Sequence, residues 1–215
     1  MKRVTKILLL ALVAVMVMGL FSGCETMEQK IEKLAGTWTM TVDDSEEQAQ
    51  ALLENIDLYE EEIAFVDLTS LDYVQIVEFD TNQNYRFAYD ADATQSCVRA
   101  FFESAFDALY ENRAALSDLY DTEFDQMDKT AFQQFYAELY LMDDFSKMLD
   151  AMAAGAYDYD ALAEDWETGT FTISHGKIMC TITGESTAEA LEYAIKGDTL
   201  TLTYADGVEV YTRSK

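Results

Sequence analysis

The fold is decided by residues 168–213, which read TGTFTISHGKIMCTITGESTAEALEYAIKGDTLTLTYADGVEVYTR. Apolar and polar side chains alternate along this stretch, which is the period of a half-buried β-strand. The dipeptides His175-Gly176, Gly197-Asp198 and Asp206-Gly207 interrupt the alternation and are typical of tight hairpin turns. The pattern predicts five consecutive strands, whose apolar positions are Phe171 and Ile173, then Ile178, Cys180 and Ile182, then Leu191, Tyr193 and Ile195, then Leu200, Leu202 and Tyr204, and finally Val208 and Val210.

Three further strands are predicted nearer the N-terminus. Residues 36–42 alternate in the same way and place Trp38 on the apolar face. Residues 73–79 and 85–89 flank a turn at 80–84 that is rich in Asp and Asn, which tolerate left-handed backbone. The total is eight strands, the number that closes a small antiparallel barrel without open edges. An open antiparallel sheet packed on helices is the alternative architecture.

Two segments have the helical period instead. Residues 46–66 are predicted to form one amphipathic helix, and residues 95–153 a helical hairpin with an aromatic stripe. Because two helices make only a thin core, we expect part of that stripe to lie on the sheet or over the barrel mouth. The predicted fold class is mainly β with helical insertions (α+β): an eight-stranded antiparallel meander barrel with one helix after strand 1 and a helical hairpin between strands 3 and 4.

The N-terminus has the features of an export signal. Residues 1–6 carry the basic side chains Lys2, Arg3 and Lys6. Residues 7–20 form an apolar run shorter than the roughly 20 residues that cross a bilayer. This favours a signal peptide over residues 1–23 against the alternative of an uncleaved membrane helix. The small residues Ser22 and Gly23 before Cys24 make the segment resemble the lipobox of bacterial lipoproteins. That resemblance implies a lipid on Cys24, a tether over 24–34 and a location on the extracytoplasmic face of the cell membrane, in the bacterial cell envelope.

The composition limits the possible partners. Asp and Glu number 41 against 14 Lys and Arg, which gives a formal net charge of −27. A chain this acidic is repelled by nucleic acid and by anionic lipid surfaces, so membrane attachment is expected through acyl chains on Cys24. Half of the residues are apolar, which is enough to bury a core and too much for a disordered chain.

The first and last strands of the predicted barrel carry sequence motifs that resemble those of a known family. Gly36-Thr37-Trp38 opens the first strand, and Val208-Glu209-Val210-Tyr211-Thr212-Arg213 closes the last one. With the meander between them, these segments look like the lipocalin-like domains of bacterial lipoproteins. The resemblance implies a domain over 35–215 in which Gly36 starts the barrel, Trp38 closes one end and Arg213 packs over the tryptophan. If Val208 and Val210 face inward, alternation turns Arg213 outward, so this contact requires a bulge or bend.

The chain offers few residues for catalysis or metal binding. Its single histidine, His175, falls in a predicted turn, and no glycine-rich phosphate loop is present. Asp80, Asn82 and Asn84 have the spacing of a calcium loop, but Tyr85 stands where that loop needs glycine. We therefore expect no catalytic residue, no metal site and no cofactor, with a hydrolase using paired carboxylates as the enzymatic alternative. Cys97 and Cys180 form either a disulfide or two free thiols.

These features predict a non-catalytic, membrane-anchored lipoprotein whose barrel binds a small apolar or amphipathic molecule, through residues that the sequence does not identify. The alternative is a structural or protein-interaction lipoprotein with a filled barrel and an acidic helical face. An eight-stranded barrel is just wide enough either to pack solid or to hold one ligand, so the cavity volume distinguishes the two functions.

Overall fold

The structure is a computed structural model that describes residues 25–205 and 207–214. The predicted signal peptide at 1–23 and the predicted lipid-attachment residue Cys24 lie outside the described residues.

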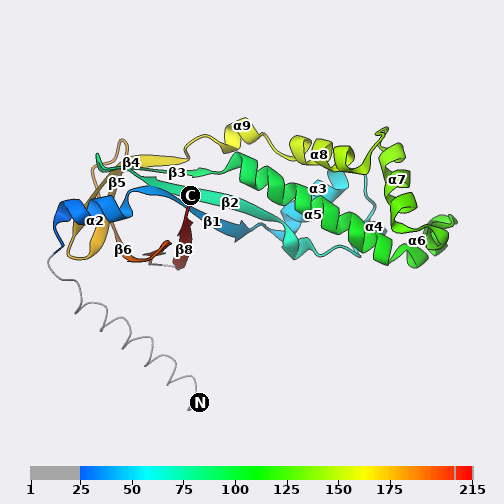
Figure 1. The fold of residues 1–215 in the computed structure, drawn as a ribbon, viewed down its shortest axis with the longest axis horizontal. Coiled ribbons are helices and arrows are strands. Elements are labelled where there is room, and N and C mark those ends of the chain that lie inside the picture. Colours follow the sequence, from blue (N-terminus) through cyan, green and yellow to red (C-terminus); the bar gives the residue numbers. More distant parts are fainter. Residues whose placement is uncertain (1–24, 206, 215) are drawn as a thin grey trace, which may run out of the picture.

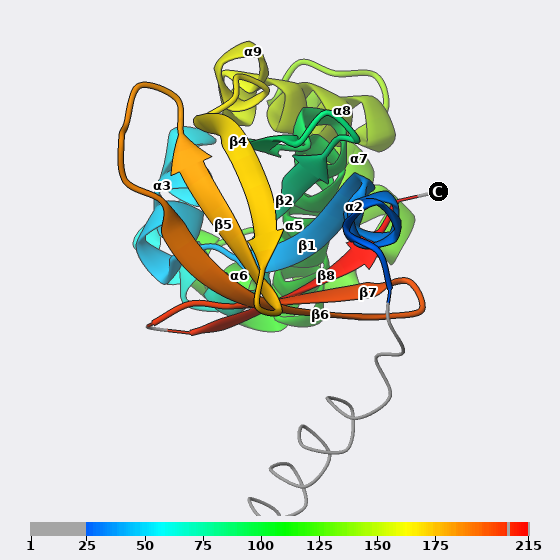
Figure 2. The same ribbon diagram turned by 90° about the vertical axis from the view of Figure 1, so that its left-hand side faces the viewer.

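Eight antiparallel strands close into a barrel in which each strand pairs with the next and β8 pairs back to β1 (Figure 2). The predicted barrel and the two positions of its helical insertions are therefore confirmed, and the open-sheet alternative is wrong. The strands are β1 (Gly36–Asp43), β2 (Asp72–Phe79), β3 (Asn84–Tyr89), β4 (Glu167–Ser174), β5 (Lys177–Ile182), β6 (Glu189–Lys196), β7 (Thr199–Thr203) and β8 (Val208–Arg213).

A short helix, α2 (Met27–Leu34), occupies most of the segment for which a tether is predicted. Thr26 and Gln29 form a capping box at its start, in which each side chain accepts a hydrogen bond from the other residue's backbone N–H. Ile31 and Leu34 are buried in the barrel core. The helix lies at one end of the barrel, beside the start of β1 (Figures 1 and 2). Because two apolar side chains of this polar segment are buried in the barrel core, the segment packs as part of the domain.

Each of the two insertions is divided into more helices than predicted. The expected single helix over 46–66 is divided because Asp57 adopts a left-handed conformation with φ of 60°. The expected hairpin over 95–153 contains several helices, and left-handed residues Asp121 and Leu141 end two of them. The elements are α3 (Glu46–Asn55), α4 (Glu60–Ile63), η1 (Leu68–Ser70), α5 (Ala91–Glu111), α6 (Arg113–Tyr120), η2 (Phe124–Gln126), α7 (Lys129–Leu139), α8 (Phe145–Ala156) and α9 (Tyr159–Leu162).

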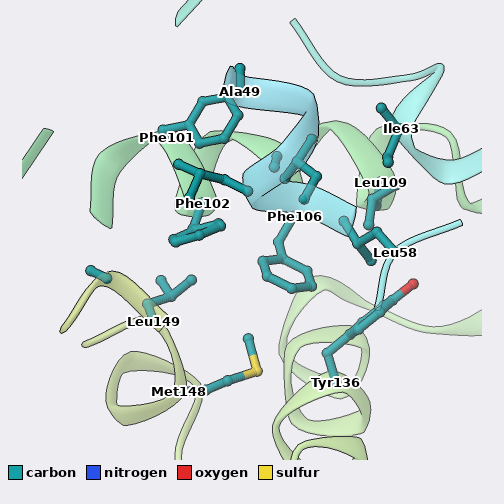
Figure 3. Packing of buried hydrophobic residues seen from close by; sticks show 14 of the residues in the cluster. Ala49, Leu58, Ile63, Phe101, Phe102, Phe106, Leu109, Tyr136, Met148 and Leu149 are labelled. Carbon is teal, nitrogen blue, oxygen red and sulfur yellow. The ribbon is translucent and has the colours of Figure 1, made fainter. Parts of the chain in front are cut away.

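These helices form a body with its own hydrophobic core beside the barrel (Figure 1). Figure 3 shows Ala49 and Leu58 of the first insertion packed with Phe106 of α5 and Tyr136 of α7. The aromatic stripe is buried in this helical body, and the described lining of the barrel mouth includes none of its residues. Helix α5 packs along β2, so the predicted alternative of a position on the sheet is the one that the structure supports. Residues of the first insertion supply the apolar surface that two helices alone would lack, so the two insertions share one core.

The last strand turns the opposite face inward from the one predicted. Val208 and Val210 are 61% and 53% exposed, whereas Tyr211 is fully buried. Strict alternation then places Glu209, Tyr211 and Arg213 on the inner side, so that Arg213 reaches the interior without a bulge. The register with β7 sets Tyr211 opposite the buried Leu200, so its ring joins the barrel core.

Candidate functional site

One end of the barrel is closed by Trp38. The indole is fully buried, and its Nε1 donates a hydrogen bond of 2.8 Å to the carbonyl oxygen of Leu34 at the end of α2. The guanidinium carbon of Arg213 lies 4.0 Å from the centre of the indole ring. A cation over an indole face is stabilising, so Arg213 seals the tryptophan in place.

Arg213 also holds the chain that enters the barrel. Its Nη1 and Nη2 donate hydrogen bonds of 2.7 and 2.6 Å to the carbonyl oxygens of Ala35 and Lys33. Gly36 has φ of 130°, and a Cβ atom there would lie 2.7 Å from Arg213 Nη1. Glycine is therefore required where the chain passes the guanidinium. The structure brings together the three residues singled out in the sequence, Gly36, Trp38 and Arg213, at this closed end.

The opposite end of the barrel is hollow. A cavity of about 380 Å³, which we call the mouth cavity, lies among the ends of β3, β5 and β7 and the starts of β4, β6 and β8. Its volume falls in the range of roughly 300–1,000 Å³ that small-molecule sites occupy. The barrel is thus packed solid around Trp38 and open at the other end.

One side of the mouth cavity is aromatic. Phe87 packs edge-to-face on Tyr85, with ring centres 5.9 Å apart, and lies 5.1 Å from the ring of Trp166. Trp166 is 50% exposed, so its ring forms part of the cavity rim. Tyr204 faces the cavity from the end of β7. Tyr85 and Phe87 are buried, so the more exposed rings of Trp166 and Tyr204 supply most of the aromatic surface of the cavity.

The charged side chains of the lining are all acidic. Glu167, Glu185, Glu189 and Glu209 border the cavity, and its described lining contains no Lys, Arg or His. Glu167 accepts a hydrogen bond of 2.9 Å from the hydroxyl of Tyr85, and Glu209 accepts one of 2.8 Å from Tyr211.

The pKa values of two side chains in the cavity lining, Tyr85 and Cys180, are raised. Burial raises the pKa of Tyr85, and hydrogen bonding to Glu167 raises it further. Burial and the charges of Glu167 and Glu189 together raise the pKa of Cys180 to about 12. Cys180 therefore remains a neutral thiol at pH 7 and is a poor nucleophile. Cys97 and Cys180 are both free thiols, so the predicted alternative of a disulfide is wrong.

The remaining sequence candidates lie in turns. His175 is exposed with φ of 52° between β4 and β5, and Asp80 accepts a hydrogen bond from the backbone N–H of Asn84 in the β2–β3 turn. Within residues 25–205 and 207–214, no group of three or more His, Cys, Asp or Glu side chains is placed to hold a metal ion. No helix in this part of the chain has the length and apolarity needed to span a membrane.

Comparisons of the chain with protein-family models, with curated proteins and with solved structures find no match. The geometry of the barrel is therefore the main guide to function. Sequence reasoning missed the residues of the mouth cavity. The spacing of Glu209 and Tyr211 was a usable signal. Residues two apart share one face of a strand, so an inward Tyr211 places Glu209 on the inner face as well.

Proposed function

We propose that this protein is a membrane-anchored extracytoplasmic lipoprotein that has no catalytic activity and binds a small apolar or amphipathic molecule in its lipocalin-like barrel. The observation that carries the proposal is the mouth cavity, which sets aromatic side chains beside four glutamates. The mouth of a β-barrel is a common place for a small-molecule site.

The hollow end favours ligand binding over a purely structural role. The structural alternative predicts a barrel filled by its own side chains. Here Trp38, Phe79 and Leu200 fill the closed end, while Phe87, Trp166 and Tyr204 border an open space. Two observations support a role without catalysis. The raised pKa of Cys180 makes its thiol a poor nucleophile, and His175 lies in an exposed turn and does not line the cavity.

The membrane anchor in the proposal is supported by the sequence of the export signal and by Ser22-Gly23-Cys24. Only Glu25 and Thr26 separate Cys24 from the start of α2. A lipid on Cys24 therefore holds α2, which lies at one end of the molecule (Figure 1), toward the membrane. The mouth cavity lies among the strand ends at the opposite end of the barrel. This orientation leaves the cavity accessible to molecules outside the cell membrane.

Binding of the neutral apolar dye N-phenyl-1-naphthylamine tests the proposal. We expect the protein to bind one dye molecule with a saturable rise in fluorescence. Ala188 is exposed and borders the cavity, so Ala188→Trp should place an indole in the opening and weaken dye binding by about tenfold or more without lowering the melting temperature.

The matched control is Ala154→Trp, which adds the same side chain at an exposed position of α8. This variant should bind the dye as the wild type does. Dye binding that does not saturate, or that is equally strong in Ala188→Trp, would show that the mouth cavity is not the binding site.

A further inference from the structure

The mouth cavity has a charge pattern that narrows the class of molecule it can hold. We propose that it selects small organic cations, meaning molecules with an ammonium or guanidinium group on an apolar body, over neutral and anionic molecules of the same shape. This inference rests on the proposed function and adds the sign of the ligand's charge.

The carboxylates of the cavity wall lack a cationic partner. Among the described residues, the ion pairs of the protein lie elsewhere, and none includes Glu167, Glu185, Glu189 or Glu209. The hydrogen bonds that Glu167 and Glu209 accept come from tyrosine hydroxyls, which are neutral donors. Their negative charge is therefore solvated and hydrogen-bonded but not neutralised by the protein.

The negative charges of these glutamates act on the same side chains of the mouth cavity. Burial raises the pKa of Tyr204, and the charges of Glu209 and Glu167 raise it further, although the two glutamates come from β8 and β4. The charges of Glu167 and Glu189 act together on Cys180 in the same way. Carboxylates from three strands thus act on side chains of a single cavity. Like charges gathered around one half-enclosed space repel one another, and a bound cation relieves that repulsion.

The aromatic side of the cavity suits the same ligand. The rings of Trp166 and Tyr204, which border the cavity, carry negative π-electron density on their faces, and such faces attract ammonium and guanidinium groups. A metal ion would need several oxygen ligands in a fixed arrangement, whereas an organic cation uses aromatic faces and carboxylates together. An anionic head group would face four carboxylates and no basic side chain among the described lining residues.

A charge series with one apolar tail tests the inference. Octylammonium, octanol and octanoate carry the same eight-carbon chain with a positive, neutral or negative head at pH 7. Isothermal titration calorimetry of the protein should give the tightest binding for octylammonium, about tenfold weaker binding for octanol, and weaker binding again for octanoate.

The variant Glu167→Gln/Glu209→Gln keeps side chains that accept hydrogen bonds but removes two charges. It should weaken octylammonium binding to about the level of octanol and leave octanol binding unchanged. Glu111→Gln/Glu123→Gln, at exposed positions of the helical body, changes the net charge by the same amount and should leave all three affinities as in the wild type.

The outcomes separate the two proposals. If octanol and octylammonium bind equally tightly, the charge selectivity is overturned while ligand binding stands. If both double variants weaken octylammonium binding to the same extent, the net charge of the protein and not the cavity is responsible, and the inference again fails. If neither the dye nor any of the three molecules binds, the proposed function fails and the inference fails with it.

Discussion

Replacement of Trp38 by alanine is expected to lower the free energy of unfolding by about 3–5 kcal/mol, the cost of other large-to-small changes in protein cores. The indole is fully buried, and its loss leaves the carbonyl oxygen of Leu34 without its donor. It also leaves the guanidinium of Arg213 without the ring on which it lies. Urea unfolding followed by circular dichroism measures this change.

The matched control is Trp166→Ala. Trp166 is 50% exposed at the rim of the mouth cavity, so its removal should cost less than about 1 kcal/mol. If Trp38→Ala also costs less than about 1 kcal/mol, the closed end does not depend on Trp38, and the account of that end is wrong.

Replacement of Cys24 by alanine should abolish fatty-acid labelling of the protein and release or mislocalise it. The expectation follows from the signal at residues 1–23 and from Ser22-Gly23-Cys24, because Cys24 is the residue to which the lipobox resemblance assigns the acyl chains. Metabolic labelling with palmitate followed by cell fractionation measures both effects.

Cys97→Ala serves as the control, since Cys97 is a half-buried thiol in α5. It should leave labelling unchanged. Labelling that persists in Cys24→Ala would overturn the anchor and, with it, the orientation proposed for the mouth cavity.

The barrel could be predicted from the sequence because a strand has a period of two and its turn residues are distinctive. The five hairpin-linked strands after residue 166 show both signals, and the contact between Trp38 and Arg213 was expected from a resemblance to known barrels. The face of β8 was predicted wrongly, because alternation gives two possible faces and does not say which one is buried.

Other features depend on contacts between distant parts of the chain. The segment 27–34 is polar apart from a few residues, and it becomes part of the domain only because Ile31 and Leu34 meet the barrel core. The break at Asp57 depends on a backbone conformation that a periodic pattern does not reveal. The mouth cavity could not be predicted because its volume depends on how side chains from several strands meet.

A crystal structure of the protein grown with N-phenyl-1-naphthylamine tests the central claim most directly. The account predicts electron density for one dye molecule inside the barrel, in contact with Phe87, Trp166 and Tyr204, with Trp38 unchanged at the other end. Density for the dye only on the outer surface, or a mouth filled by the protein's own side chains, would contradict the claim that this barrel holds a ligand.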